Sequence, residues 1–136
     1  MQLRVLGAHN LESKDTRMES HLLDGVLALD AGSLTSALTF EEQMGVRAIL
    51  LTHRHFDHVR DLLPLGLARM RESRATLDVF AIQDTADVVS SKLLDGTMYP
   101  NFLEMPSRES PTFRLLGFRY RRAVRAFSIP VTPARA

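Results

Sequence analysis

Short apolar runs alternate along this chain with longer stretches in which apolar residues recur every three or four positions. Runs of the first kind predict β-strands, and stretches of the second kind predict amphipathic helices. The predicted strands cover residues 3–6, 21–23, 26–29, 46–51, 76–82, 112–120 and 123–131. The predicted helices cover residues 33–45, 59–72 and a third stretch that opens at 84–87 and ends at Gly96. Because strands alternate with helices, the pattern predicts an α/β (α+β) fold in a single domain over residues 1–136.

Two short motifs mark boundaries between these elements. Asp24-Gly25 separates two predicted strands and is typical of a tight β-hairpin turn. Thr39, followed three residues later by Glu42, has the pattern of a capping box within the predicted helix 33–45. Gly45 is a suitable C-terminal stop for that helix.

Composition and charge narrow the function classes. The chain has 136 residues, a formal net charge of +1 and no cysteine, so any metal site must use His, Asp or Glu. A near-neutral balance without single-sign blocks argues against nucleic-acid binding. The N-terminus lacks the apolar core of a signal peptide, and no segment has the length of a membrane helix. A soluble cytoplasmic protein is therefore expected.

Three of the five histidines lie in one seven-residue stretch, Thr52-His53-Arg54-His55-Phe56-Asp57-His58. The stretch follows the predicted strand 46–51, and α/β proteins carry their chemistry at the carboxyl ends of such strands. In an extended backbone, residues two apart point to the same side. His53, His55 and Asp57 can therefore face one point, while His58 falls at the start of the next predicted helix.

These side chains suit divalent metals. Two neutral imidazoles, from His53 and His55, are typical ligands of a zinc-like ion, and Asp57 with His58 offers oxygen and nitrogen to a second ion. Two such ions about 3.5–4 Å apart can activate a water and stabilise the oxygens of a displacement. A lone histidine is more often a surface or core residue, but a cluster at this spacing after a buried strand favours a metal site.

Asp30 ends another predicted strand. Its carboxylate can orient a ligand histidine through the second ring nitrogen, and the same residue type is also typical of helix caps and turns. The remaining polar candidates are more typical of solvated positions. These are His9 in the first loop, His21 at a strand start, Asp61 in a predicted helix, and the basic cluster Arg119, Arg121, Arg122 and Arg125 on an edge strand. The alternatives are that His9 faces the same site, that His21 is structural, and that Arg119 or its neighbours meet the phosphate of an anionic substrate.

Residues 52–58 resemble the H-x-H-x-D-H motif of the metallo-β-lactamase superfamily residue for residue, and Leu29-Asp30-Ala31-Gly32 is similar to a run that the superfamily carries before it. The first strand, the absence of cysteine and the Thr-His-x-His-x-Asp-His form resemble the branch with cyclic-nucleotide phosphodiesterases and ribonuclease Z. The resemblance implies that His53 and His55 bind one metal and that Asp57 and His58 bind the other. Zinc is the implied cofactor, in up to two sites, with manganese and iron as open alternatives.

The chain departs from the superfamily after the motif. No histidine follows His58, so a third ligand of the first site and a last ligand of the second are missing, and the bridging aspartate has no clear counterpart. The superfamily fold is a four-layer αββα sandwich of two similar halves, and this chain corresponds to about the first half. One sheet face is then expected to lack its partner. The alternatives are a longer parent enzyme, C-terminal strands that fold back, and a homodimer packed sheet to sheet, which we favour.

The resemblance implies a phosphodiesterase-like, metal-dependent hydrolase. Such an enzyme cleaves a small anionic ester or phosphodiester through a metal-bound hydroxide, with Asp57 as the catalytic carboxylate. Because a catalytic zinc normally has three protein ligands, the first site is not expected to be complete in this chain alone. The alternative is a non-catalytic, self-associating domain with a vestigial or structural metal site. No membrane or nucleic-acid partner is expected.

Overall fold

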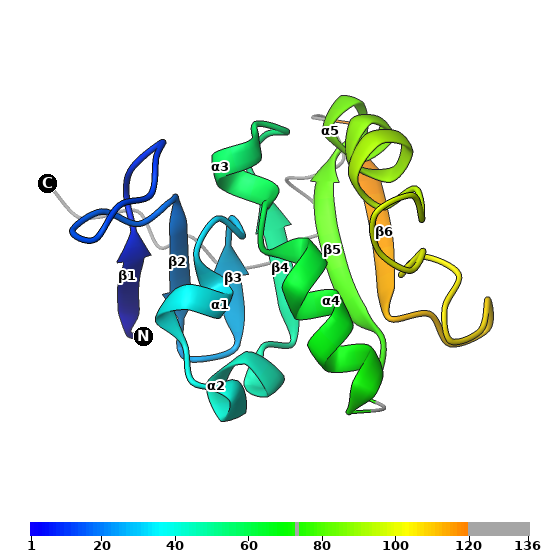
Figure 1. Ribbon diagram of the computed structural model, residues 1–136, viewed down its shortest axis with the longest axis horizontal. Coiled ribbons are helices and arrows are strands. Elements are labelled where there is room, and N and C mark those ends of the chain that lie inside the picture. Colours follow the sequence, from blue (N-terminus) through cyan, green and yellow to red (C-terminus); the bar gives the residue numbers. More distant parts are fainter. Residues whose placement is uncertain (73, 120–136) are drawn as a thin grey trace, which may run out of the picture.

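The computed structural model describes residues 1–72 and 74–119; the predicted strand 123–131 and Arg121, Arg122 and Arg125 lie outside this part of the chain. A six-stranded mixed sheet runs through the described part (Figure 1). Its strands follow in sequence order: β1 (Leu3–Gly7), β2 (Ser20–Leu23), β3 (Leu27–Leu29), β4 (Ala48–Leu51), β5 (Leu77–Ile82) and β6 (Phe113–Phe118). The predicted mixture of strands and helices is confirmed.

The sheet changes from antiparallel to parallel at β3. The pairs β1–β2 and β2–β3 are antiparallel, whereas β3, β4, β5 and β6 run parallel. Asp24 (φ 49°) and Gly25 (φ 72°) form the predicted turn between β2 and β3, where positive φ matches the twist of a hairpin. Because the last four strands are parallel, their carboxyl ends meet at one edge of the sheet.

The helices are shorter than predicted. α1 (Leu34–Ala37) and α2 (Phe40–Gly45) replace the single helix expected over 33–45. α3 (Phe56–Val59) and α4 (Leu62–Arg71) replace the one expected over 59–72. α5 (Gln83–Val88) continues into a short π-helix, η1 (Val89–Leu93).

The break between α1 and α2 has a clear local cause. Leu38 is extended (φ −108°, ψ 144°), and Thr39 then starts α2 with the predicted capping box. The Glu42 amide donates to Thr39 Oγ1 (3.3 Å), and the Thr39 amide donates to Glu42 Oε2 (2.8 Å). The capping box therefore begins a new helix, because these bonds replace the ones that a longer helix would make.

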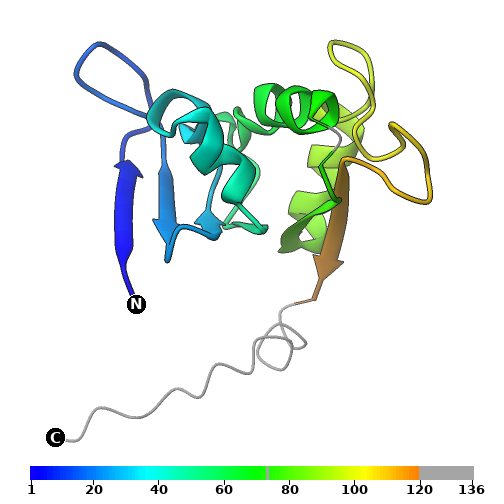
Figure 2. The same cartoon turned by 90° about the horizontal axis from the view of Figure 1, so that it is seen from below.

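One face of the sheet forms the core. A row of apolar residues crosses the strands in register, and each is at most 1% exposed: Leu22, Ala28, Ile49 and Val79. Helices α1, α2 and α4 lie over this face (Figure 2). In the described part of the chain, no helix is both long enough and apolar enough to cross a membrane.

Arg69 ties α4 to the neighbouring elements. It is 5% exposed, and its guanidinium donates to backbone carbonyls at the end of α2 and before β5: those of Gln43, Met44, Val46 and Ala75. Burial lowers the pKa of Arg69. The side chain thereby satisfies carbonyls that the end of α2 leaves without a helical partner.

The expectation that Asp61 is a solvated helix acid is wrong. Asp61 is 1% exposed, and its Oδ2 accepts hydrogen bonds from the Thr35 amide (2.6 Å) and the Thr35 hydroxyl (2.8 Å). Its Oδ1 accepts a third from Arg60 Nε (2.8 Å). A buried carboxylate is costly unless it is paired, so this residue works as the link between α1 and the start of α4.

Replacing Asp61 with alanine should lower the free energy of unfolding by about 2–4 kcal/mol, because the Thr35 amide and hydroxyl lose their shared acceptor. Urea denaturation measures the loss. Asp15→Ala, at an exposed loop position, is the matched control and should change stability by less than about 0.5 kcal/mol. Equal losses in the two variants would contradict the structural role of Asp61.

Candidate metal centre

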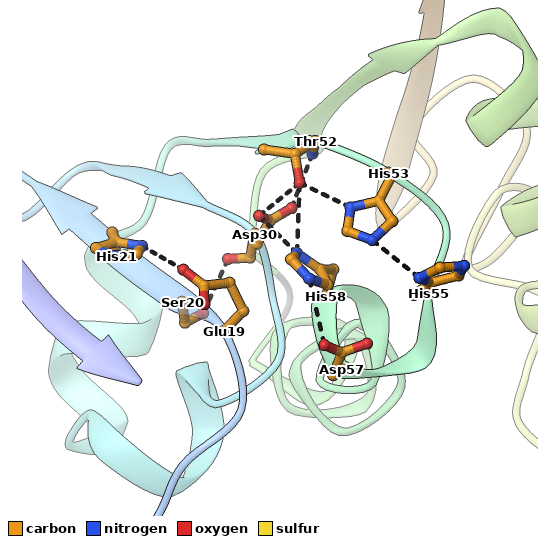
Figure 3. A network of polar contacts seen from close by, with 9 residues as sticks. All are labelled: Glu19, Ser20, His21, Asp30, Thr52, His53, His55, Asp57 and His58. Atoms are coloured by element: carbon orange, nitrogen blue, oxygen red, sulfur yellow. Dashed lines mark hydrogen bonds and ion pairs between the residues drawn. The ribbon is translucent and has the colours of Figure 1, made fainter. Parts of the chain in front are cut away.

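The candidate site lies where two neighbouring parallel strands end. Thr52 to His55 follow β4, Asp57 and His58 belong to the short helix α3, and Asp30 comes directly after β3. Figure 3 shows the side chains of these segments turned toward one another. The structure therefore brings together the four predicted ligands His53, His55, Asp57 and His58 with Asp30.

Asp30 is the anchor of this cluster. Its backbone has a positive φ of 59°, which aspartate tolerates better than most residues, and its amide donates to the Leu50 carbonyl (2.9 Å). The side chain is buried, and its carboxylate accepts three hydrogen bonds of 2.8 Å each: from the Thr52 amide, the Thr52 hydroxyl and His58 Nδ1. The helix-cap alternative does not apply, since Ser33 is the N-cap of α1.

The contact with Asp30 sets the tautomer of His58. A carboxylate accepts from a protonated ring nitrogen, so Nδ1 is the nitrogen that donates to Asp30, and Nε2 is the nitrogen that faces Asp57. That Nε2 lies 3.3 Å from Asp57 Oδ2. His58 Nε2 and Asp57 Oδ2 thus lie side by side. The carboxylate that orients the ring is that of Asp30, as is typical of metal-binding histidines.

Thr52 orders His53 in a similar way. The Thr52 hydroxyl donates to Asp30, which leaves its oxygen free to accept from His53 Nδ1 (3.1 Å). His53 Nε2 then faces His55 Nδ1 at 3.1 Å. Burial, followed by the nearby His58 and His55, lowers the pKa of His53, and this favours the neutral imidazole that a metal requires.

The donor atoms form two pairs with separations close to those of shared metal ligands. Two atoms that bind one tetrahedral zinc at about 2.0–2.1 Å lie about 3.3–3.4 Å apart. His53 Nε2 lies 3.1 Å from His55 Nδ1, and His58 Nε2 lies 3.3 Å from Asp57 Oδ2. Within residues 1–72 and 74–119, no group of three or more His, Cys, Asp or Glu side chains is arranged to hold an ion. The residues thus suit two-ligand sites that need further ligands.

The other two histidines come from the loop after β1 and from β2. His9 is exposed in the loop after β1. His21 lies on β2, where its Nδ1 is 3.3 Å from Glu19 Oε1, and Figure 3 shows its ring facing Glu19. The exposure of His9 agrees with the expectation of a solvated loop residue, and His21 is half-buried on its strand.

Sequence reasoning assigned no role to two residues that shape the site, Thr52 and Gly32. At Gly32, a Cβ atom would lie 1.9 Å from the Asp57 carbonyl oxygen, so only glycine allows α3 to approach this closely. Next to it, the Ala31 amide donates to the His58 carbonyl (2.7 Å). The glycine at the end of the Leu-Asp-Ala-Gly run was the available signal, since it stands beside a candidate site residue.

Comparison with known proteins supports the fold. No protein-family model matches the chain, and no curated protein matches it. Among solved structures, unliganded yeast PDE1 superimposes with a TM-score of 0.67 and 14% identity, over 86% of this chain and 50% of that one. The metallo-β-lactamase fold protein YhfI from Bacillus subtilis does so with a TM-score of 0.61 and 20% identity, over 86% and 45%.

The chain therefore spans about half the length of these two structures. The superpositions confirm the predicted resemblance for the fold. Sequence identities of 14% and 20% do not specify an activity. The polypeptide adopts the metallo-β-lactamase fold over about half of the length of these structures.

Proposed function

We propose that this chain is the metal-binding part of a hydrolase that cleaves phosphodiesters or related anionic esters. The observation that carries the proposal is the pair of donor sets: His53 Nε2 lies 3.1 Å from His55 Nδ1, and His58 Nε2 lies 3.3 Å from Asp57 Oδ2. Thr52 and Asp30 hold the other ring nitrogens of His53 and His58. The fold similarity to yeast PDE1, a phosphodiesterase, supports the substrate class.

In the proposed site, His53 and His55 hold one ion and Asp57 and His58 hold the other, with zinc as the preferred metal. A divalent ion held by these residues would supply Lewis acidity for the cleavage of the ester. Asp30 keeps Nε2 of His58 aimed at the site and balances positive charge with a buried carboxylate. Asp57 accepts a hydrogen bond from the attacking water and orients it. Manganese or iron would suit the same nitrogen and oxygen ligands.

Arg119 is not favoured as a substrate anchor. It lines a cavity of about 610 Å³ after β5 and β6, together with the carboxylates of Asp84 and Asp87. Two acids beside one guanidinium offset its charge, so the cavity does not favour an anion. Residues 121, 122 and 125 of the basic cluster lie outside the described part of the chain.

A non-catalytic domain with a structural metal site is the second candidate. The absence of a third ligand in the described part of the chain favours it, because a catalytic zinc normally has three protein ligands. Metal binding and turnover must therefore be measured separately. Binding without turnover would support the second candidate and contradict hydrolysis by this chain.

Removal of one proposed ligand should weaken zinc binding. His53→Ala and His58→Ala are each expected to reduce affinity at least tenfold, because the loss of a mere orienting partner already costs about 10–100-fold. Chelator competition gives the affinity, and elemental analysis gives the metal content per chain. His9→Ala, at an exposed loop position, is the control and should bind like the unchanged chain. Equal binding by all variants would rule out this site.

The hydrolase itself is tested with a chromogenic phosphodiester, bis(p-nitrophenyl) phosphate. The zinc-loaded chain should hydrolyse it, treatment with a chelator should abolish turnover, and added zinc should restore it. Asp57→Asn should lose turnover while it keeps the fold. A zinc-loaded, folded chain without turnover would contradict the proposed activity.

Asp30→Asn should lower zinc affinity by about 10–100-fold without unfolding the chain, because asparagine keeps only one acceptor oxygen. If that oxygen stays with the Thr52 amide, an NH2 donor replaces the oxygen that accepts from the Thr52 hydroxyl and His58 Nδ1. Asn also tolerates positive φ, so the backbone conformation is kept. Asp24→Asn is a matched control, since Asp24 has a positive φ of 49° in an exposed turn far from the site. Competition with a chelator gives the zinc affinity of both variants, and circular dichroism shows whether each variant keeps its fold. Unchanged affinity in Asp30→Asn would show that this carboxylate does not orient a ligand.

A further inference from the structure

A groove lies beside the histidine motif, between α3 and the segment formed by α5 and η1. Its volume is about 190 Å³. Arg54 and Lys92 lie on its lining, and no acidic residue of the described part of the chain belongs to that lining. The groove therefore combines positive charge with an apolar surface, which comes from both of its sides: Phe56, Val59, Val88, Val89 and Leu93.

The groove is distinct from the proposed metal site, although both use the loop after β4. Arg54 lies between His53 and His55 in the sequence, and Phe56 follows directly after them. Figure 3 shows the two histidines among the side chains that gather near Asp30, and none of the four proposed ligands lines the groove. The residues between and after the ligands are therefore available to bind a different chemical group.

The positive charge in the groove is largely unpaired. Arg54 is exposed, and its guanidinium makes no hydrogen bond or ion pair with the residues that the structure describes. Lys92 is also exposed and interacts electrostatically with Asp95, whose carboxylate already accepts a hydrogen bond from the Thr97 amide (2.9 Å). Cations next to an apolar surface attract an anion more strongly than cations in open water, because the dielectric constant near the protein is lower.

An irregular helical turn shapes the second wall of the groove. The Leu94 amide donates to the Val89 carbonyl (2.9 Å), which is the i to i+5 hydrogen bond of a π-helix. Residues five positions apart lie on different faces of an α-helix, whereas a wider π turn brings them toward one face. Val88 and Leu93 have this spacing, and both line the groove. Because π turns are rare and frequently occur at functional sites, this turn is a second observation in favour of a binding site.

The volume of the groove limits its ligand to a small group. A cavity of about 150 Å³ encloses one benzene ring, whereas pockets for drug-sized ligands measure about 300–1,000 Å³. The groove therefore has room for one aromatic ring or a short acyl chain. The successive apolar anchors of a bound helix need a longer surface, and so do the two chains of a lipid.

We propose that this groove binds a small phosphate monoester, with an aryl or short acyl group on the apolar lining and the phosphate between Arg54 and Lys92. A phosphate monoester carries a charge of about −1.5 to −2 at pH 7, which matches two cations. Arginine and lysine both donate charge-assisted hydrogen bonds to phosphate oxygens. The inference goes beyond the proposed function and does not depend on it, because none of the groove residues is a proposed metal ligand.

A chemical-shift titration of the metal-free chain by nuclear magnetic resonance tests the proposal. Phenyl phosphate is the probe, and inorganic phosphate and benzyl alcohol carry its charge and its ring separately. Phenyl phosphate should bind at least about tenfold more tightly than either of them, because it uses both parts of the groove. Equal affinity for phenyl phosphate and one of the other two compounds, or the absence of saturable binding, would overturn the proposal.

The same titration locates the ligand. The backbone amide signals of residues 88–93 should shift as phenyl phosphate is added, while the signal of His9 in the first loop should not. Shifts that spare residues 88–93 would place the ligand at the histidines or elsewhere on the chain, and this result would contradict the groove as the binding site.

Variants assign the binding to particular side chains. Arg54→Gln and Lys92→Gln should each weaken the binding of phenyl phosphate at least about fivefold, because each removes a charged donor. Phe56→Ala should weaken phenyl phosphate but not inorganic phosphate. Arg47→Gln, at an exposed position before β4, and Lys14→Gln, in the first loop, are the controls for the loss of one charge. Circular dichroism shows whether each variant folds, and equal affinity of the folded groove variants and the two controls would contradict the proposal.

Discussion

The buried carboxylate of Asp30 is the interaction on which the candidate site depends. Its three hydrogen bonds join the end of β3 to the loop after β4 and to α3. A buried charge that loses these partners is strongly unfavourable, so the loop has few alternative conformations. The positive φ of Asp30 brings a local strain, and the surrounding hydrogen bonds of its amide and carbonyl hold that strain in place.

Backbone hydrogen bonds hold the segment that contains Asp30 against α3, in addition to the hydrogen bonds of the Asp30 side chain. The segment Asp30-Ala31-Gly32 runs alongside α3. The Ala31 amide donates to the His58 carbonyl, and the Asp61 amide donates to the Ala31 carbonyl (both 2.7 Å). Gly32 permits the close approach, and Asp61 then fastens the start of α4 to Thr35. The geometry of the four proposed ligands is therefore determined by β3, β4 and the helices on the core face, and not by the opposite face of the sheet.

Much of the fold could be predicted because its signals are local. The hairpin at Asp24-Gly25, the capping box at Thr39 and the strand periodicity each depend on neighbours in sequence. The helix break at Leu38 and the burial of Asp61 could not be predicted, because they depend on partners more than twenty residues away or on competition between two helical arrangements. In the site, the spacing of the motif predicted which side chains meet. The tautomers of His53 and His58 required the position of Thr52 and Asp30 in space.

The donor set of the candidate site is ordered but incomplete. The donor pairs are ordered by hydrogen bonds to β3 and β4, and these bonds are complete within the described residues. These bonds orient the rings of His53 and His58. Additional metal ligands, by contrast, must come from side chains that the described part of the chain does not bring to this edge. The order of the donor atoms and the completeness of the donor set are thus separate properties of the described residues.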